Sequence, residues 1–201
     1  MIYSSNFLPC LAFMSSILKE NDISINIGEQ YQKQSYHTRA YILGPNKVDF
    51  INVNVKKAPN HTPIKDIKID YSQNWNNVAW KTIQNTYKKS SYFEYYDYIL
   101  EPIFSKKSEF LVDINVFALE KVFQILKIKP KISLVEYPFL EYQHEFLTFN
   151  AKKRLDLPEN YLSVPYYQIF GNTFEPNLSI IDLLFSKGPD SLEILRKSAS
   201  N

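Results

Sequence analysis

The chain has 201 residues, a formal net charge of +2 and only four glycines. An average chain of this length carries about 14 glycines, and these four are too scattered to form G-x-G-x-x-G or G-x-x-x-x-G-K-[ST]. The sequence therefore excludes a glycine-rich loop around a pyrophosphate. The nearly balanced charge argues against a nucleic-acid partner, and the length allows one domain with a sizeable core.

The cysteine and histidine content excludes two further classes of protein. Cys10 is the only cysteine and the three histidines are scattered, so we expect neither an internal disulfide nor a zinc site. We interpret Cys10 as a buried structural thiol, because no His or cation lies near it in the sequence to lower its pKa. No window of 18 apolar residues predicts a membrane span. The apolar run 7–14 lacks the features of a signal peptide, so we expect a cytoplasmic protein.

The first half of the chain begins with a helix pattern and continues with strand patterns. The apolar run 7–19 predicts a helix, and the alternating run 23–27 predicts a strand. Three more runs, 36–43, 48–55 and 64–70, show the period of two that is typical of half-buried strands. We expect these three to form a small antiparallel meander.

The second half of the chain is mainly helical. Apolar spacing predicts a bent helix over about 75–100 and a clearer one over 111–126. The runs 132–137 and 164–170 are candidate strands, and the pattern of 138–158 is ambiguous. Strands that alternate with helices in this way predict an α/β fold.

The last part of the chain carries clear helix signals. Ser179 with Asp182 three residues later resembles a capping box, which predicts the start of a helix. Gly188 predicts its end, and Pro189 opens a final helix.

A polar stretch between two predicted strands holds the first candidate binding residues. Gln30, Lys33 and Arg39 lie where α/β sheets bind ligands, although an ordinary exposed connection is the alternative. His37 shares a strand face with Arg39, and this pair suits an anion or a polarised oxygen. A solvent-facing strand end is the other interpretation. Asp70 ends a predicted strand, where it serves either as an acid in a cleft or as a helix cap.

The order of these segments resembles that of the WbqC-like protein family, in its shorter branch. The stretches 29–36 (EQYQKQSY) and 176–185 (PNLSIIDLLF) carry the resemblance most specifically. The likeness extends over nearly the whole chain apart from roughly 136–162. It implies a single domain over residues 1–201, with an antiparallel insertion at approximately 36–70.

The resemblance implies a fold and a function. The fold is α/β, with a Rossmann-like, mixed or mostly parallel sheet, flanking helices and a small antiparallel meander. Members are bacterial, and some lie among genes for O-antigen and other surface polysaccharides. This implies a cytoplasmic transferase or modifying enzyme that acts on nucleotide-linked or lipid-linked sugars. The alternative is a catalytically degenerate binding or assembly protein of the cell-envelope machinery. No cofactor and no oligomeric state is implied.

The family motifs also imply site residues. We predict that His37 and Asp70 handle a proton in catalysis. The residues predicted to bind a small-molecule or sugar-phosphate ligand are Gln30, Lys33, Tyr36, Arg39, Trp80, Asn115, Asn177 and Asp182.

The chain departs from the family pattern at two places. It has Ala79-Trp80 where the family usually has His-Trp, and His37-Thr38-Arg39 where the family usually has Arg-Asn-Arg or Arg-Thr-Arg. If the absent His moves a proton, this copy is slow or inactive unless His37 replaces it.

Overall fold

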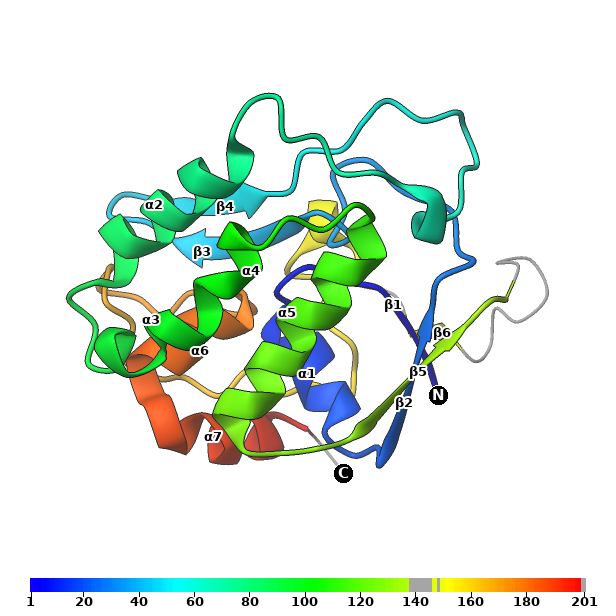
Figure 1. Ribbon diagram of the computed structural model, residues 1–201. Coiled ribbons are helices and arrows are strands. Elements are labelled where there is room, and N and C mark those ends of the chain that lie inside the picture. The colour runs from blue at the N-terminus through cyan, green and yellow to red at the C-terminus, as the bar shows by residue number, and fades with distance from the viewer. Residues whose placement is uncertain (138–145, 148, 200–201) are drawn as a thin grey trace.

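A computed structural model describes residues 1–137, 146–147 and 149–199 of the chain. It contains a parallel sheet with the strand order β5–β2–β1–β6 and a separate antiparallel pair, β3–β4 (Figure 1). The strands are β1 (Ile2–Ser4), β2 (Asp22–Asn26), β3 (Arg39–Leu43), β4 (Val48–Asn52), β5 (Lys131–Val135) and β6 (Phe146–Leu147). The expected α/β class, with a parallel sheet and a small antiparallel one, is confirmed.

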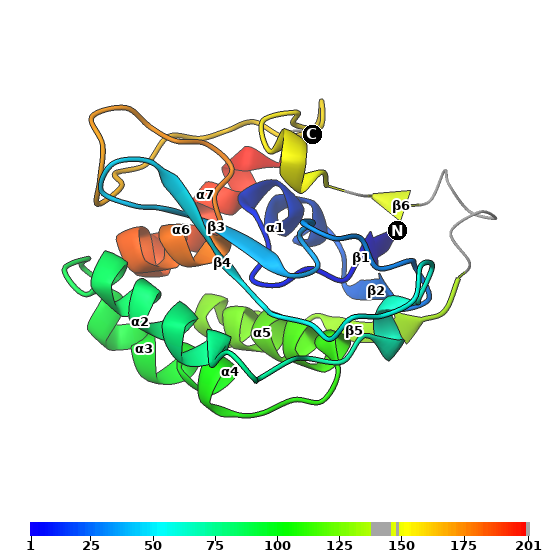
Figure 2. The ribbon, with the colours of Figure 1, turned by 90° about the horizontal axis from the view of Figure 1, so that it is seen from above.

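The helices form two groups. They are α1 (Leu11–Ile17), α2 (Trp75–Tyr87), α3 (Phe93–Leu100), α4 (Pro102–Ser105), α5 (Leu111–Leu126), α6 (Ile180–Lys187) and α7 (Ser191–Ser198). Figure 2 shows α2 to α5 on one side of the molecule and α1, α6 and α7 on the other. The β3–β4 hairpin runs over the boundary between the groups, and the parallel sheet lies at one end. Within the described residues, no helix has the length and apolar character needed to cross a bilayer.

Helix α1 is a short buried helix whose start depends on the far end of the chain. It links β1 to the parallel strand β2, which makes a β–α–β unit. The N–H of Leu11 donates to the carbonyl of Leu178 at 3.0 Å. The N–H of Ala12 donates to Oδ1 of Asn177, also at 3.0 Å. These partners satisfy helix N–H groups that lack an intrahelical acceptor.

One face of the parallel sheet is apolar. Tyr3 of β1 pairs with Ile25 of β2, and Ile23 pairs with Ile132 of β5. Side chains at these paired positions project from the same face. Tyr3, Ile23 and Ile25, which lie on the two central strands, are buried. Strand β5 lies at the edge of the sheet and is more exposed.

The helices predicted from the strongest apolar patterns agree with the structure, with one exception. The helix predicted over 111–126 is confirmed as α5. The single helix predicted over 75–100 is wrong, because α2 ends at Tyr87 and α3 begins at Phe93. Ser90 accounts for the break, since both its N–H and its hydroxyl donate to the carbonyl of Tyr87.

Two predicted strands are wrong. The stretch 64–70 begins as a 3₁₀ turn, Ile64–Asp66, and continues with only isolated bridges, such as Val55 to Ile69. Ile67 and Ile69 are nevertheless buried, so the alternation indicates burial without a ladder. The stretch 164–170 forms no strand either. Instead, the Gln168 side chain bonds the N–H and the carbonyl of Glu175.

The predicted capping box is also wrong. The hydroxyl of Ser179 donates to the carbonyl of Leu8 at 2.8 Å. The carboxylate of Asp182 faces the core, where it accepts bonds from the hydroxyls of Tyr87 and Tyr166 at 2.8 and 2.6 Å. Gly188 does follow the end of α6, with φ +54°.

Two further predictions concern Cys10 and the middle of the chain. Cys10 is buried, and burial raises the pKa of its thiol to about 11. The interpretation as a structural thiol is confirmed. Part of 138–158 lies outside the described residues. The described remainder holds β6 and a 3₁₀ turn, Ala151–Lys153.

Candidate anion-binding site

A pocket of about 650 Å³ lies beside β4 and the loop that follows it. Its walls come from the loop after β2, the start of β3, residues 52–61 and the segment that leads into α2. We call it the basic pocket, because four Lys and Arg side chains line it against only one carboxylate. They are Lys33, Arg39, Lys56, Lys57 and Asp70.

In the part of the chain that the structure describes, the four cations of the basic pocket form no direct salt bridge, although the charge of Lys56 also acts on Asp70. Within the described residues, none of them takes part in an ion pair. The guanidinium carbon of Arg39 lies 4.4 Å from the centroid of the Phe50 ring, and its buried Nε has no acceptor. This contact holds Arg39 in place while its charge remains available to an anion.

Asp70 is ionised at neutral pH. Its Oδ1 accepts the N–H of Ser72 at 2.9 Å. This bond, the hydroxyl of Ser72 and the charge of Lys56 lower the pKa of the Asp70 carboxyl group. The side chain therefore offers the pocket a hydrogen-bond acceptor that holds a proton weakly.

His37 lies close in sequence to these residues but does not line the pocket. Its side chain is buried, and Nε2 is 3.5 Å from Oε1 of Glu29. Nδ1 accepts the N–H of Gln32 at 3.3 Å. We therefore assign the ring proton to Nε2, which faces Glu29. The Tyr31 ring, which does line the pocket, has its centroid 6.0 Å from that of the imidazole.

Glu29 is a buried carboxylate that sequence reasoning missed. It accepts bonds from the hydroxyl of Ser4 at 2.7 Å and from the N–H of Ser5 at 3.0 Å. It thereby joins the end of β1 to the loop that carries His37. Its place in the stretch 29–36 was the one available signal.

Asn115 anchors the same loop from α5. Its Nδ2 donates to the carbonyl of His37 at 3.0 Å and to the hydroxyl of Ser5 at 3.1 Å. Asn115 is buried and lies outside the basic pocket. Its contacts indicate that it positions the loop behind the pocket.

The other predicted binding residues lie elsewhere. Gln30 is exposed but does not line the basic pocket. Tyr36 is buried near Cys10, and burial raises the pKa of its hydroxyl. Trp80 stacks between Phe93 and Phe104, with ring centroids 6.3 and 5.5 Å away.

Asn177 and Asp182 take part in internal packing away from the basic pocket. Besides its bond to α1, Asn177 donates to the carbonyl of Arg154 at 2.9 Å. Asp182 is fully buried against α2. The structure thus brings Lys33, Arg39 and Asp70 together and places Asn177 and Asp182 away from them.

Lys56 and Lys57 line the basic pocket but are not among the residues predicted from the sequence. One signal points to Lys56. Asn52 and Asn54 lie on the face of the strand pattern opposite to Ile51, and Lys56 continues that period of two. All three line the basic pocket.

A smaller hollow of about 330 Å³ adjoins the basic pocket. The two share Asn52, Asn54 and Gln73. Ala79 of α2 lines this hollow. In the described part of the chain, no three His, Cys, Asp or Glu side chains gather in a way that could hold a metal ion.

A family model now identifies the chain. The model of the WbqC-like protein family matches residues 4–156 and 151–194. This chain belongs to the WbqC-like protein family. No curated protein and no solved structure matches it. In this WbqC-like protein, the matched region includes the whole basic pocket and the Glu29–His37 pair.

Proposed function

We propose that this WbqC-like protein binds a phosphate-bearing sugar in the basic pocket. In this proposal it is a cytoplasmic transferase or modifying enzyme of bacterial surface-polysaccharide synthesis, acting on nucleotide-linked or lipid-linked sugars. The observation that carries the proposal is a group of four cations around one pocket, none of which forms an ion pair within the described residues. Its volume of about 650 Å³ is typical of small-molecule sites.

The pocket residues suit different parts of such a ligand. Arg39 offers a planar, fixed donor group, and Lys33 and Lys56 offer mobile ammonium groups, for the phosphate. The lowered pKa of Asp70 makes it a weak general base. We therefore assign it chiefly to accepting a bond from a sugar hydroxyl. The half-buried Tyr31 ring provides a stacking surface for a sugar or base.

His37 acts as a positioning residue in this proposal. Glu29, Gln32 and Asn115 hold its ring and its carbonyl behind the pocket wall. The loop 30–39 therefore presents Lys33 and Arg39 from a fixed base. This arrangement reduces the conformational entropy that a ligand must remove.

Binding of glucose 1-phosphate, with glucose as its uncharged counterpart, tests the proposal by calorimetry. We expect the phosphate ester to bind and glucose not to bind. Arg39→Ala should weaken binding by about tenfold or more, because a charged hydrogen bond contributes about 1.5–3 kcal/mol. Lys81→Ala is the matched control, since Lys81 is exposed on α2 outside the pocket. Absence of binding, or an equal effect of the two variants, contradicts the proposal.

A second candidate function is a degenerate binding or assembly protein. The observation that favours it is Ala79, which leaves the adjoining hollow without the His that the family usually carries. Incubation with UDP-glucose and with dTDP-glucose, with either water or a polyprenyl phosphate as the acceptor of the glucosyl group, followed by detection of released nucleotide, separates the two functions. Release that Asp70→Asn reduces supports an enzyme. Binding without any release supports the second candidate.

The polysaccharide profile of a deletion strain tests the biological role. We expect the deletion to alter the profile and the native chain to restore it. Arg39→Ala should fail to restore it, whereas Lys81→Ala should restore it. A normal profile in the deletion strain contradicts a role in polysaccharide synthesis. It does not bear on ligand binding, which calorimetry tests separately.

A further inference from the structure

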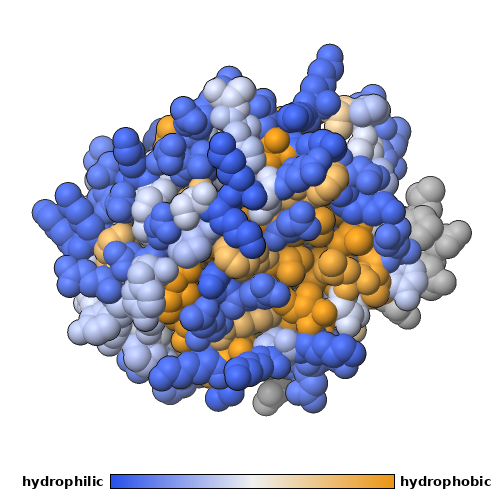
Figure 3. All heavy atoms as spheres, in the orientation of Figure 1, coloured by the Kyte–Doolittle hydropathy of each residue, from blue (hydrophilic) through white to orange (hydrophobic). Residues whose placement is uncertain are grey.

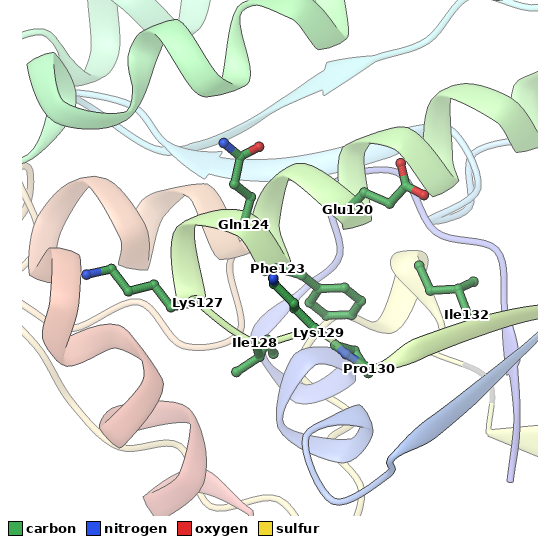
Figure 4. A pocket seen from close by; sticks show the side chains of 8 residues that line it. All are labelled: Glu120, Phe123, Gln124, Lys127, Ile128, Lys129, Pro130 and Ile132. Carbon is green, nitrogen blue, oxygen red and sulfur yellow. The ribbon is translucent and has the colours of Figure 1, made fainter.

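A second hollow, apolar in its lining, lies far from the basic pocket. It has a volume of about 560 Å³ and lies where the C-terminal half of α5 turns into β5. Its apolar lining is Phe123, Ile128, Pro130 and Ile132 (Figure 4). It shares no lining residue with the basic pocket. Figure 3 shows apolar side chains gathered on this face, in the region between α5 and β5.

The apolar surface continues beyond the hollow along β5. Leu134 is 50% exposed. It lies two residues after Ile132 in the same strand, so the two side chains project from the same face. We call the hollow together with Leu134 the α5–β5 groove.

The charges of the α5–β5 groove are unevenly placed. Lys127 and Lys129 lie at the turn between α5 and β5, and within the described residues neither forms an ion pair. In Figure 4 the Lys129 side chain runs toward Phe123, and Glu120 lies at the Ile132 end of the view. One end of the groove is therefore cationic, and the other carries a carboxylate.

We propose that the α5–β5 groove binds an amphipathic anion, an alkyl or acyl chain with a phosphate or carboxylate head. The head lies at Lys129, whose side chain runs toward Phe123, whereas the Lys127 side chain runs away from the hollow (Figure 4). The chain covers Phe123 and Ile132 and points toward Leu134. Glu120 enforces this direction, because it repels an anionic head at the other end. The proposal goes beyond the function of the basic pocket and does not depend on it.

Charge favours an anionic amphiphile as the occupant. Its chain buries the apolar surface of the groove, and its head pairs with Lys129, which forms no ion pair within the described residues.

Backbone amide shifts of the full-length protein locate and measure such binding. The four probes are decyl phosphate, decanoate, decyl maltoside and inorganic phosphate, all below the concentration at which micelles form. We expect both anionic amphiphiles to shift the amides of 123–134 and to saturate. Decyl maltoside should bind more weakly by up to about fivefold, and inorganic phosphate should leave 123–134 unchanged. Octyl phosphate should bind more weakly than decyl phosphate, by about fourfold at most per methylene removed.

Charge-reversal variants complete the test. Lys129→Glu should weaken the binding of decyl phosphate by about tenfold, and Lys127→Glu should weaken it less, because its side chain points away from the hollow. Both side chains are exposed, so these variants should fold. Lys81→Glu, on α2, is the matched control and should bind as the native chain does. Ile132→Asn should weaken all three ten-carbon probes together.

Three results overturn the proposal. They are shifts that do not include 123–134, equal binding of decyl maltoside and decyl phosphate, and equal binding by Lys129→Glu and Lys81→Glu. Arg39→Ala separates this proposal from the proposed function. That variant should lose glucose 1-phosphate from the basic pocket and leave the shifts of 123–134 with decyl phosphate unchanged.

Discussion

Nε2 of His37 lies 3.5 Å from Oε1 of Glu29, and both side chains are buried. Glu29→Ala would leave His37, the Ser4 hydroxyl and the Ser5 N–H without their acceptor. We expect it to lower the free energy of unfolding by about 3–5 kcal/mol in urea titrations, because each buried donor left unpaired costs about 1–3 kcal/mol. Glu109→Ala is the control, because Glu109 pairs with Lys68 on the surface, and it should cost less than about 1 kcal/mol. Equal losses would contradict the assigned role of Glu29.

Asp182 makes stability depend on pH in a defined direction. Burial raises its pKa, although the bonds from Tyr166, Tyr87 and Gln168 lower it in part. The folded chain therefore holds this proton more tightly than the unfolded chain, whose Asp pKa is about 3.9. Above that value, and up to the raised folded pKa, the contribution of Asp182 to stability falls as pH rises.

The Asp182→Asn variant isolates this effect, because it has no proton to lose at this position. Urea unfolding of both proteins from about pH 4 to about pH 7 gives the difference in unfolding free energy. We expect native minus variant to decrease as pH rises. An increase would mean that the three bonds outweigh burial.

Asn177 caps α1 from a distance, with φ +51°. Asn177→Ala removes the acceptor for the Ala12 N–H. It also forces alanine into a positive-φ conformation, which is less favourable for alanine than for asparagine. We expect a loss of about 2 kcal/mol in unfolding free energy. Asn177→Asp keeps an acceptor for the Ala12 N–H and should lose less than the Ala variant. Asn177→Gly keeps the backbone relaxed but lacks the acceptor, so it separates strain from capping.

Ala79→His tests whether the hollow beside the basic pocket can hold the His that the family resemblance implies at this position. Ala79 lines about 330 Å³ of open space, so we expect the unfolding free energy to fall by less than about 1.5 kcal/mol. Ile83→His, one turn later on α2 and fully buried, should cost at least about 3 kcal/mol. If the protein is a degenerate enzyme, Ala79→His should also increase nucleotide release from UDP-glucose. A severe loss of stability would mean that this hollow cannot hold a His side chain at position 79.

Sequence patterns predict those helices and strands that have one clearly buried face. The stripe of α5 and the alternation of β2 follow from one buried face, and both are confirmed. The run 64–70 shows the same alternation but finds only isolated bridging partners. A single sequence cannot show this, because ladder partners come from distant parts of the chain.

The candidate site is predicted in part for a similar reason. Lys33, Arg39 and Asp70 lie near predicted strand ends, and the structure brings them to one pocket. Asp182 and Ser179 match a capping box in spacing, but spacing does not reveal that Tyr87 and Tyr166 compete for the carboxylate. Glu29 resembles any polar loop residue until Ser4 and His37 are seen beside it.

The bonds that fix the start of α1 have a consequence for the order of folding. Ser179 reaches Leu8 across 171 positions of the sequence, and Asn177 reaches Ala12 across 165. During synthesis on the ribosome, α1 is exposed long before these partners are made. Contacts of such wide separation close slowly. We therefore expect the first β–α–β unit to reach its native form only after the C-terminal segment has left the ribosome.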